Sequence, residues 1–150
     1  MLWADEIIVA DSHSTDGTSE IAEKMGAKVI HIPFEGYGHL RNKAISYCTN
    51  EWIFSLDSDE RCTLEVKNEI LSIINTSSID IFKVPRKNFF MGKWIKHSGW
   101  YPNYRQPQLF RNGKMYYTDE EVHEGFVSHS EKKIGKLKNH IWQFPFKNTE

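Results

Sequence analysis

Short apolar runs alternate with helical patterns along the first half of the chain. Strand character is found in residues 7–10, 28–32 and 52–56. Apolar side chains recur at helical spacing in residues 18–25, 39–48 and 63–75. Strands that alternate with helices predict an α/β fold, in which helices pack on a parallel sheet.

Capping residues mark the ends of two of these helices. Gly26 is placed to end the helix at 18–25, and Thr63 can cap the helix that runs to about Asn75. Asp16 or Thr15 can cap the start of the helix at 18. The boundaries of these helices therefore follow from local chemistry.

The second half of the chain is less regular. One more strand is predicted at 79–84, and beyond Pro85 the pattern becomes irregular. Short strands are predicted at 108–111, 114–117, 122–128 and 134–137. A chain of 150 residues without a linker is expected to form one domain.

Charge is unevenly distributed, although the formal net charge is only -1. Acids outnumber bases in residues 1–80, whereas residues 81–118 contain no Asp or Glu and combine lysines and arginines with many aromatic residues. Rings and cations suit a phosphorylated sugar or a single-stranded nucleic acid. The alternative is that most of the rings, Phe82, Phe90 and Phe110 above all, belong to the core.

Cysteine use and hydropathy bear on the compartment. Cys48 and Cys62 make no disulfide framework, so we expect reduced thiols in a cytosolic protein. No apolar run approaches the ~20 residues that cross a bilayer, and no signal peptide is visible. Any membrane association is therefore expected to be peripheral.

Two acidic residues directly follow the predicted strand at 52–56. Asp57 and Asp59 flank Ser58, and ligands of α/β proteins bind just past the carboxyl ends of strands. Paired carboxylates suit a hard cation, Mg²⁺ or Mn²⁺, which also binds phosphate oxygens. Taken alone, the pattern is weak, because two acids in a turn are usually solvated.

Further candidates lie near other strand and helix ends. Asp11 closes the first strand and is expected at the same sheet edge, where it and Ser12 could hold a ribose or base. Arg41 near a helix start could bind a phosphate, or it could lie on a solvated helix face.

A second acidic cluster occupies residues 119–124. One of its carboxylates could act as a general base, whereas a solvated turn is the alternative for Asp119, Glu120 and Glu121. If residues 122–124 form a strand, His123 and Glu124 point to opposite faces.

In this order the motifs resemble the family 2 glycosyltransferases of the GT-A fold. The branch most similar to the chain adds glucose to the inner core of lipopolysaccharide. The matching segments are residues 3–18, 26–29, 41–42, 55–61, 85–95, 99–102, 109–111 and 122–124. They cover nearly the whole chain, and together they are far more specific than any one of them.

The resemblance implies a GT-A-like, Rossmann-like fold, with a mostly parallel sheet flanked by helices. The family's first strand and helix are lacking, so we expect an N-terminally truncated chain with reduced nucleotide affinity. Residues 1–150 form a single domain by this resemblance. Residues 1–80 are its nucleotide-sugar and metal half, and residues 81–150 are its acceptor half.

The resemblance also implies the activity, an inverting, metal-dependent transfer of a hexose, glucose above all, from a UDP-sugar to a lipopolysaccharide core or related glycan acceptor. The residues implied to bind the nucleotide sugar are Asp11, Ser12, Arg41 and Asp57. Those implied to bind the divalent cation (Mg²⁺ or Mn²⁺) are Asp59 and Asp57. The catalytic base is Glu124, with Asp119 to Glu121 as the fallback. The acceptor residues are Arg86, Lys87, Trp94, Trp100, Tyr101 and His123.

One departure and several alternatives accompany this resemblance. His13 stands where the branch often has Gly. The leading alternative function is a non-catalytic remnant that binds a sugar or a partner. A nucleic-acid binder is disfavoured by the acidic first half, which would repel phosphates, and a metal-dependent phosphatase or nuclease is more distant. The expected location is cytoplasmic, at the inner face of the inner membrane.

Overall fold

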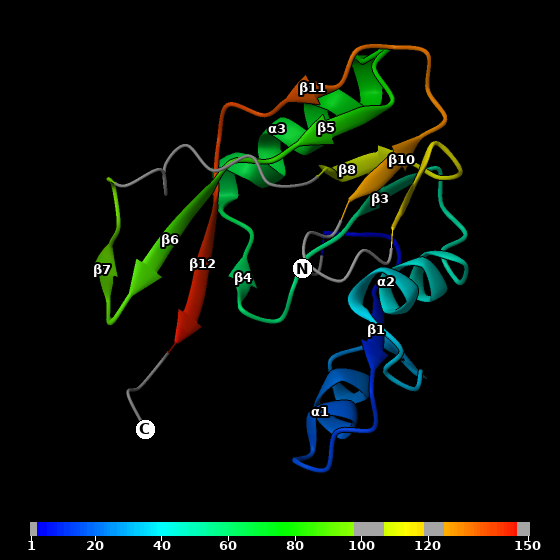
Figure 1. Ribbon diagram of the computed structural model, residues 1–150, viewed down its shortest axis with the longest axis vertical. Helices are drawn as coiled ribbons and strands as arrows, with labels where there is room; N and C mark the ends of the chain where they lie inside the picture. The colour runs from blue at the N-terminus through cyan, green and yellow to red at the C-terminus, as the bar shows by residue number, and fades with distance from the viewer. Residues whose placement is uncertain (1–2, 98–106, 119–124, 147–150) are drawn as a thin grey trace. The chain divides into compact units, whose positions relative to one another are not determined.

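The structure is a computed structural model that describes residues 3–97, 107–118 and 125–146 (Figure 1). The chain divides into two compact units, each made of two segments. The first unit contains Met1–Ile53 and Asn112–His129, and the second contains Phe54–Arg111 and Ser130–Glu150. The chain contains both α-helices and β-strands, which confirms the predicted α/β class. The predicted division into a nucleotide-sugar and metal half, residues 1–80, and an acceptor half, residues 81–150, does not follow the boundaries of these units and stays a prediction.

The first unit begins with a strand–helix–strand motif. Strand β1 (Ile8–Asp11) pairs in parallel with β2 (Lys28–His31), and helix α1 (Thr18–Lys24) connects them. The register sets Asp11 opposite His31, so the carboxyl ends of the two strands meet. The predicted strands and the intervening helix are confirmed.

Three further elements complete the described part of the first unit. They are α2 (Tyr37–Ile45), β9 (Met115–Tyr117) and β10 (Phe126–Ser128), and β9 and β10 pair as antiparallel strands. Strand β3 (Trp52–Phe54) then leads from the first unit into the second.

The capping prediction for the C-terminal end of α1 is confirmed. Gly26 has a φ of 86°, and its N–H donates to the carbonyl of Glu23 at 2.9 Å. The N–H of Ala27 reaches the carbonyl of Ala22 at 3.1 Å, which completes a Schellman motif. At the other end, the prediction that Asp16 or Thr15 is the N-cap is wrong, because the N-cap is Gly17 and no side chain caps it. The Asp16 carboxylate, one position earlier, accepts the backbone N–H of Thr18 at 3.1 Å.

The second unit contains a sheet built around β5 (Ile81–Lys83). This strand pairs in antiparallel sense with β8 (Pro107–Arg111) and in parallel sense with β11 (Gly135–Lys136). Helix α3 (Leu64–Thr76) buries Val66 and Ile70, and the Thr63 hydroxyl accepts the N–H of Val66 at 3.3 Å as the predicted cap. The buried side chains of this unit include Phe110, Ile81, Leu109, Leu137, Ile141 and Val84.

A further sheet in the second unit was not predicted. Its order is β4 (Glu60–Arg61), β12 (Ile141–Phe146), β6 (Arg86–Phe90) and β7 (Lys93–Trp94), and Figure 1 shows β6 and β12 side by side. Strand β12 runs antiparallel to β4 and parallel to β6. Strand β6 escaped detection because the side chains it buries, Arg86 and Asn88, are polar.

Helix α1 differs from the expectation of a packed apolar face. None of its residues is buried, and Ile21 and the C-cap residue Met25 are 59% and 65% exposed. Within the described part of the first unit, no element therefore covers this side of α1.

None of the described helices is long and apolar enough to cross a membrane.

Candidate functional site

The acidic pair lies in a short turn between β3 and β4. The N–H of Asp57 donates to the Glu60 carboxylate at 3.0 Å, and Arg61 donates to the carbonyl of Ser58 at 2.8 Å. Strand β12 also contacts the turn, because the amide of Gln143 donates to the Asp59 carboxylate at 3.0 Å. Ser58 is exposed, whereas both aspartates are half-buried. Side chains of β4 therefore fix the backbone of the turn, and Gln143 of β12 holds the Asp59 carboxylate.

Beneath this turn lies a buried polar cluster that sequence reasoning missed. Glu60, Arg86 and Gln108 are 3%, 5% and 5% exposed. Arg86 Nη2 is 3.0 Å from Glu60 Oε1, and Gln108 Nε2 donates to Glu60 Oε2 at 2.7 Å. Burial raises the pKa of the Glu60 carboxyl, and the Arg86 guanidinium opposes that rise. Glu60 thus links β4, β6, β8 and the acidic turn through one carboxylate.

The carboxylates of the acidic turn are oxygen donors of the kind that Mg²⁺ and Mn²⁺ accept. Within residues 3–97, 107–118 and 125–146, no group of three or more His, Cys, Asp or Glu side chains is placed to hold a metal ion. Mg²⁺ often takes only one or two protein carboxylates and completes its shell with phosphate oxygens and water. Asp57 and Asp59 supply hard oxygen donors of that kind, and their metal role stays a prediction.

In the first unit, Asp11 is held at the end of β1. Its carboxylate accepts the N–H of Ser14 at 3.1 Å and the hydroxyl of Ser19 at 3.0 Å, and it lies 3.3 Å from Nδ1 of His31. The bond with Ser14 is the largest of the effects that lower the pKa of Asp11. Only 4% of Asp11 is exposed, so this carboxylate organises the loop that follows it. Its predicted contact with the nucleotide sugar, like that of exposed Ser12, stays a prediction.

The loop after Asp11 also explains why glycine suits position 13. His13 has a φ of 63°, in the left-handed region that glycine adopts at least cost. Its ring stacks on that of His31, with ring centroids 5.7 Å apart. The departure from the family pattern therefore falls on a backbone position where a side chain is unfavourable.

We expect Asp11→Asn to lower the free energy of unfolding by about 1–2 kcal/mol at pH 7, because it weakens charge-assisted hydrogen bonds. The ordinary pKa of Asp11 is 3.8, and the folded value is lower. Its stabilising effect is therefore present above pH 3.8 and is lost as the pH falls through the folded pKa. Urea unfolding from pH 7 to pH 3 should show the gap between wild type and variant closing at the acid end. Asp5→Asn, at an exposed carboxylate, is the matched control; a gap independent of pH would contradict the assignment.

Helix α2 presents Arg41 beside two aromatic rings. The guanidinium carbon lies 5.8 Å from the ring centroid of Tyr37 and 5.3 Å from that of Tyr117. Asn42 holds α2 to β9, because its amide donates to the carbonyl of Tyr117 at 2.7 Å and accepts the N–H of Tyr117 at 2.9 Å. Arg41 is half-buried in this setting, and its phosphate contact stays a prediction.

The predicted acceptor residues divide into three groups. Arg86 is buried against Glu60, so its contacts are those of a residue that positions the acidic turn. Lys87 and Trp94 come together on β6 and β7, where Lys87 Nζ lies 4.3 Å from the Trp94 ring centroid. The remaining candidates lie outside the described residues: Trp100, Tyr101, His123 and Glu124, with the fallback bases Asp119, Glu120 and Glu121.

Sequence comparison identifies relatives among bacterial glycosyltransferases. The model of Glycosyl transferase family 2 matches residues 4–130. An uncharacterised glycosyltransferase of Rickettsia conorii is 45% identical over 76 residues, which are 51% of this chain and 27% of that protein. The lipopolysaccharide core biosynthesis glycosyltransferase LpsC of Rhizobium meliloti is 30% identical over 134 residues, 81% of this chain and 47% of LpsC. The chain thus spans less than half the length of these two curated relatives.

Comparison of structures agrees on the fold. The crystal structure of S. aureus TarS in complex with UDP-GlcNAc matches with a TM-score of 0.71 and 19% sequence identity. The match covers 95% of this chain and 50% of that one, and it confirms the predicted GT-A-like architecture. Since the family model spans most of the residues, from 4 to 130, the chain belongs to Glycosyl transferase family 2.

Proposed function

We propose that this domain transfers a hexose, glucose above all, from a UDP-sugar to a lipopolysaccharide core sugar or a related glycan. Transfer inverts the anomeric centre and uses Mg²⁺ or Mn²⁺. The complex of TarS with UDP-GlcNAc supports the class of donor. The name of the Rhizobium meliloti relative supports the class of acceptor. A cytoplasmic location at the inner face of the inner membrane belongs to the same proposal.

The acidic turn is the observation that carries this proposal. Asp57 and Asp59 are half-buried at the end of β3, and the turn is fixed from below by Glu60 and from β12 by Gln143. A turn that merely faces solvent does not need a buried carboxylate to hold its backbone. A prearranged pair of carboxylates has a smaller entropic cost to pay when a cation and a diphosphate bind.

The proposed reaction is a direct displacement. Glu124, or a neighbouring carboxylate in 119–121, takes the proton from the acceptor hydroxyl. That oxygen bonds to the anomeric carbon as the bond to the UDP oxygen breaks, and UDP leaves with the electron pair. Asp59 and Asp57 would hold the cation, which supplies charge neutralisation for the departing diphosphate. Asp11, Ser12 and Arg41 would bind the nucleotide, in the donor half of residues 1–80.

The acceptor side of the proposal rests on the basic aromatic half, residues 81–150. Lys87 and Trp94 form a cation–ring pair there, and such a surface suits a phosphorylated sugar. Trp100, Tyr101 and His123 belong to the same predicted surface, whereas Arg86 would act by holding the acidic turn.

Calorimetric titration of UDP and UDP-glucose, with and without Mn²⁺, tests the proposal. We expect heat that depends on Mn²⁺ and is lost in Asp59→Ala. Circular dichroism of each sample establishes that it is folded. Heat that is independent of Mn²⁺ and equal in the variant would contradict the metal role. No heat from a folded wild-type sample would favour the alternative, a non-catalytic remnant of such an enzyme.

A further inference from the structure

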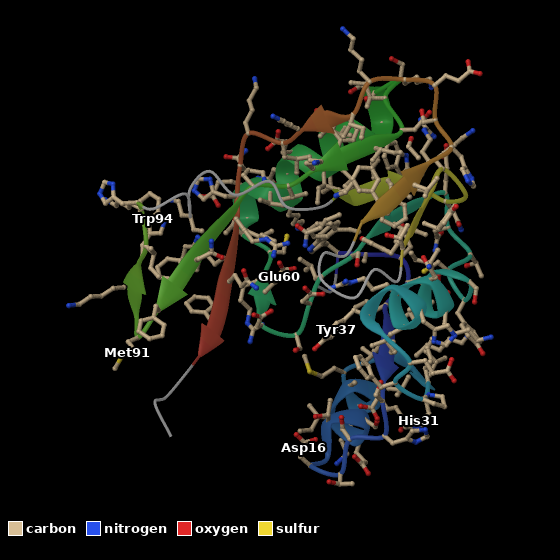
Figure 2. All side chains as sticks on the ribbon, viewed as in Figure 1. Asp16, His31, Tyr37, Glu60, Met91 and Trp94 are labelled. Atoms are coloured by element: carbon tan, nitrogen blue, oxygen red, sulfur yellow. The ribbon has the colours of Figure 1, made fainter. Side chains whose placement is uncertain are left out.

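A two-residue hairpin ends the sheet of β4, β12, β6 and β7. Phe89 pairs with Trp94 and Phe90 pairs with Lys93, which leaves Met91 and Gly92 as the turn. Their φ angles are 49° and 75°. Two positive φ angles are typical of a type I′ turn, which matches the twist of the flanking strands. Figure 2 shows Met91 at the tip of this hairpin and Trp94 on β7.

The tip is apolar where a polar residue would fit better. The first position of a type I′ turn favours Asn, Asp or Gly, because left-handed backbone is unfavourable for a long side chain. Met91 nevertheless occupies it and is 58% exposed, and the neighbouring Phe90 is 44% exposed. An unfavourable backbone state that displays an apolar side chain to water is evidence that this side chain has a function.

Three lysines belong to the same hairpin segment as this apolar tip. Lys87 Nζ and Lys96 Nζ lie 4.3 Å and 4.6 Å from the ring centroid of Trp94, and Lys93 is exposed beside the turn. Residues 86–97 contain no Asp or Glu. The hairpin therefore combines an apolar tip, an amphipathic indole ring and lysines, and it has no acidic residue of its own.

We propose that the β6–β7 hairpin docks on an anionic lipid bilayer. Phe90 and Met91 enter the interface, and Lys93 and Lys96 face lipid phosphates. Lys87 and Trp94, which also belong to the proposed acceptor surface, lie at the level of the headgroups. Tryptophan is enriched at bilayer interfaces, and lysines near an anionic leaflet strengthen binding. A lysine can bury its carbon chain while its ammonium reaches the phosphates.

Two other occupants fit this hairpin less well. The sugars of the proposed acceptor have no long apolar part to cover Met91, and the lipid that carries a lipopolysaccharide core lies in a bilayer. A second copy of the chain would bring the same lysines to the contact, and like charges oppose each other. Charge and shape together favour the bilayer. This inference deepens the membrane location in the proposed function and rests on it, but it is tested separately from the transfer reaction, because lipid binding needs neither donor nor acceptor.

Flotation with lipid vesicles tests the inference. We expect the wild-type chain to float with vesicles of phosphatidylcholine and phosphatidylglycerol in equal parts, and to bind phosphatidylcholine vesicles much less. Phe90→Thr with Met91→Asn should lower the partition coefficient about 10- to 100-fold, from lost apolar burial. Asn suits the turn, so this variant should melt at the wild-type temperature or above. Lys93→Gln and Lys96→Gln should each lower binding about fivefold.

Leu64→Gln is the matched control, because Leu64 is 66% exposed in the same unit but lies outside the hairpin. It should float as the wild type does. Equal binding of wild type to neutral and anionic vesicles would overturn the proposal, as would full binding by the Phe90→Thr, Met91→Asn variant. Tighter binding to a single-stranded oligonucleotide than to vesicles, retained in that variant, would overturn it in favour of nucleic acid.

Discussion

Arg86→Met is expected to lower the free energy of unfolding by about 3–5 kcal/mol at pH 7, which is the usual cost of removing one partner from a buried ion pair. Arg86 and Glu60 are 5% and 3% exposed, and their charged atoms lie 3.0 Å apart. Methionine fills similar space but leaves the Glu60 carboxylate buried without its cation. Urea unfolding of wild type and variant measures the difference.

The pH dependence of this loss has a definite sign. Burial already raises the pKa of Glu60 above its ordinary value of 4.5, and Arg86 opposes that rise. In the variant the Arg86 charge no longer opposes it, although the bonds from the Asp57 N–H and from Gln108 remain. The Glu60 contribution to stability is then greatest below pH 4.5 and is lost as the pH rises through the raised folded pKa. The cost of Arg86→Met should therefore be larger at pH 8 than at pH 5.

Adding Glu60→Gln to Arg86→Met should restore most of the lost stability, because the buried charge is then gone. Arg61→Met, at an exposed arginine of β4, is the control and should cost about 1 kcal/mol or less. If Arg86→Met cost no more than this control, the buried pair would not be what holds the acidic turn.

Asp59→Asn is expected to reduce Mn²⁺-dependent sugar transfer at least about 100-fold, while the melting temperature changes little. This prediction rests on the proposed function. Asparagine can still accept the bond from Gln143, whose amide lies 3.0 Å from the Asp59 carboxylate. What the variant lacks is the negative charge that binds the cation. Release of UDP, measured over a range of Mn²⁺ concentrations, gives the comparison.

Ser58→Ala is the matched change, because Ser58 is exposed between the two aspartates and its carbonyl, not its side chain, accepts the bond from Arg61. Its rate should stay within a few fold of wild type. A rate for Asp59→Asn above a tenth of wild type at saturating Mn²⁺ would mean that Asp59 does not hold the metal.

The elements of the first half could be predicted because their signals are local. Strands β1 and β2 are short apolar runs, and the ends of α1 and α3 depend on Gly26 and Thr63, which act on neighbouring residues. Strands β6 and β12 gave no such signal. Strand β6 buries Arg86 and Asn88, and β12 contains a proline, so neither resembles an ordinary strand.

For the site, the sequence was informative only about residues close together in the chain. Asp57 and Asp59 could be placed at a strand end from the apolar run before them. The partners that fix their turn could not be found in this way. Gln108 lies 48 positions from Glu60, and Gln143 lies 84 positions from Asp59. The contact of Arg86 with Glu60 is likewise not visible in the sequence, where Arg86 is only one of several bases in an acid-free stretch.

The dependence of the acidic turn on β12 has a consequence for how the protein is made. Ribosomes release a chain from its N-terminus, so Asp59 emerges long before residues 141–146. Gln143, which lies 84 positions further along the chain, and the N–H of Phe144, which bonds the carbonyl of Asp59 at 2.9 Å, reach it only after those residues have been made. A nascent chain that has not reached β12 already carries both carboxylates but lacks the strand that fixes one of them. The turn is thus among the last parts of the second unit to mature.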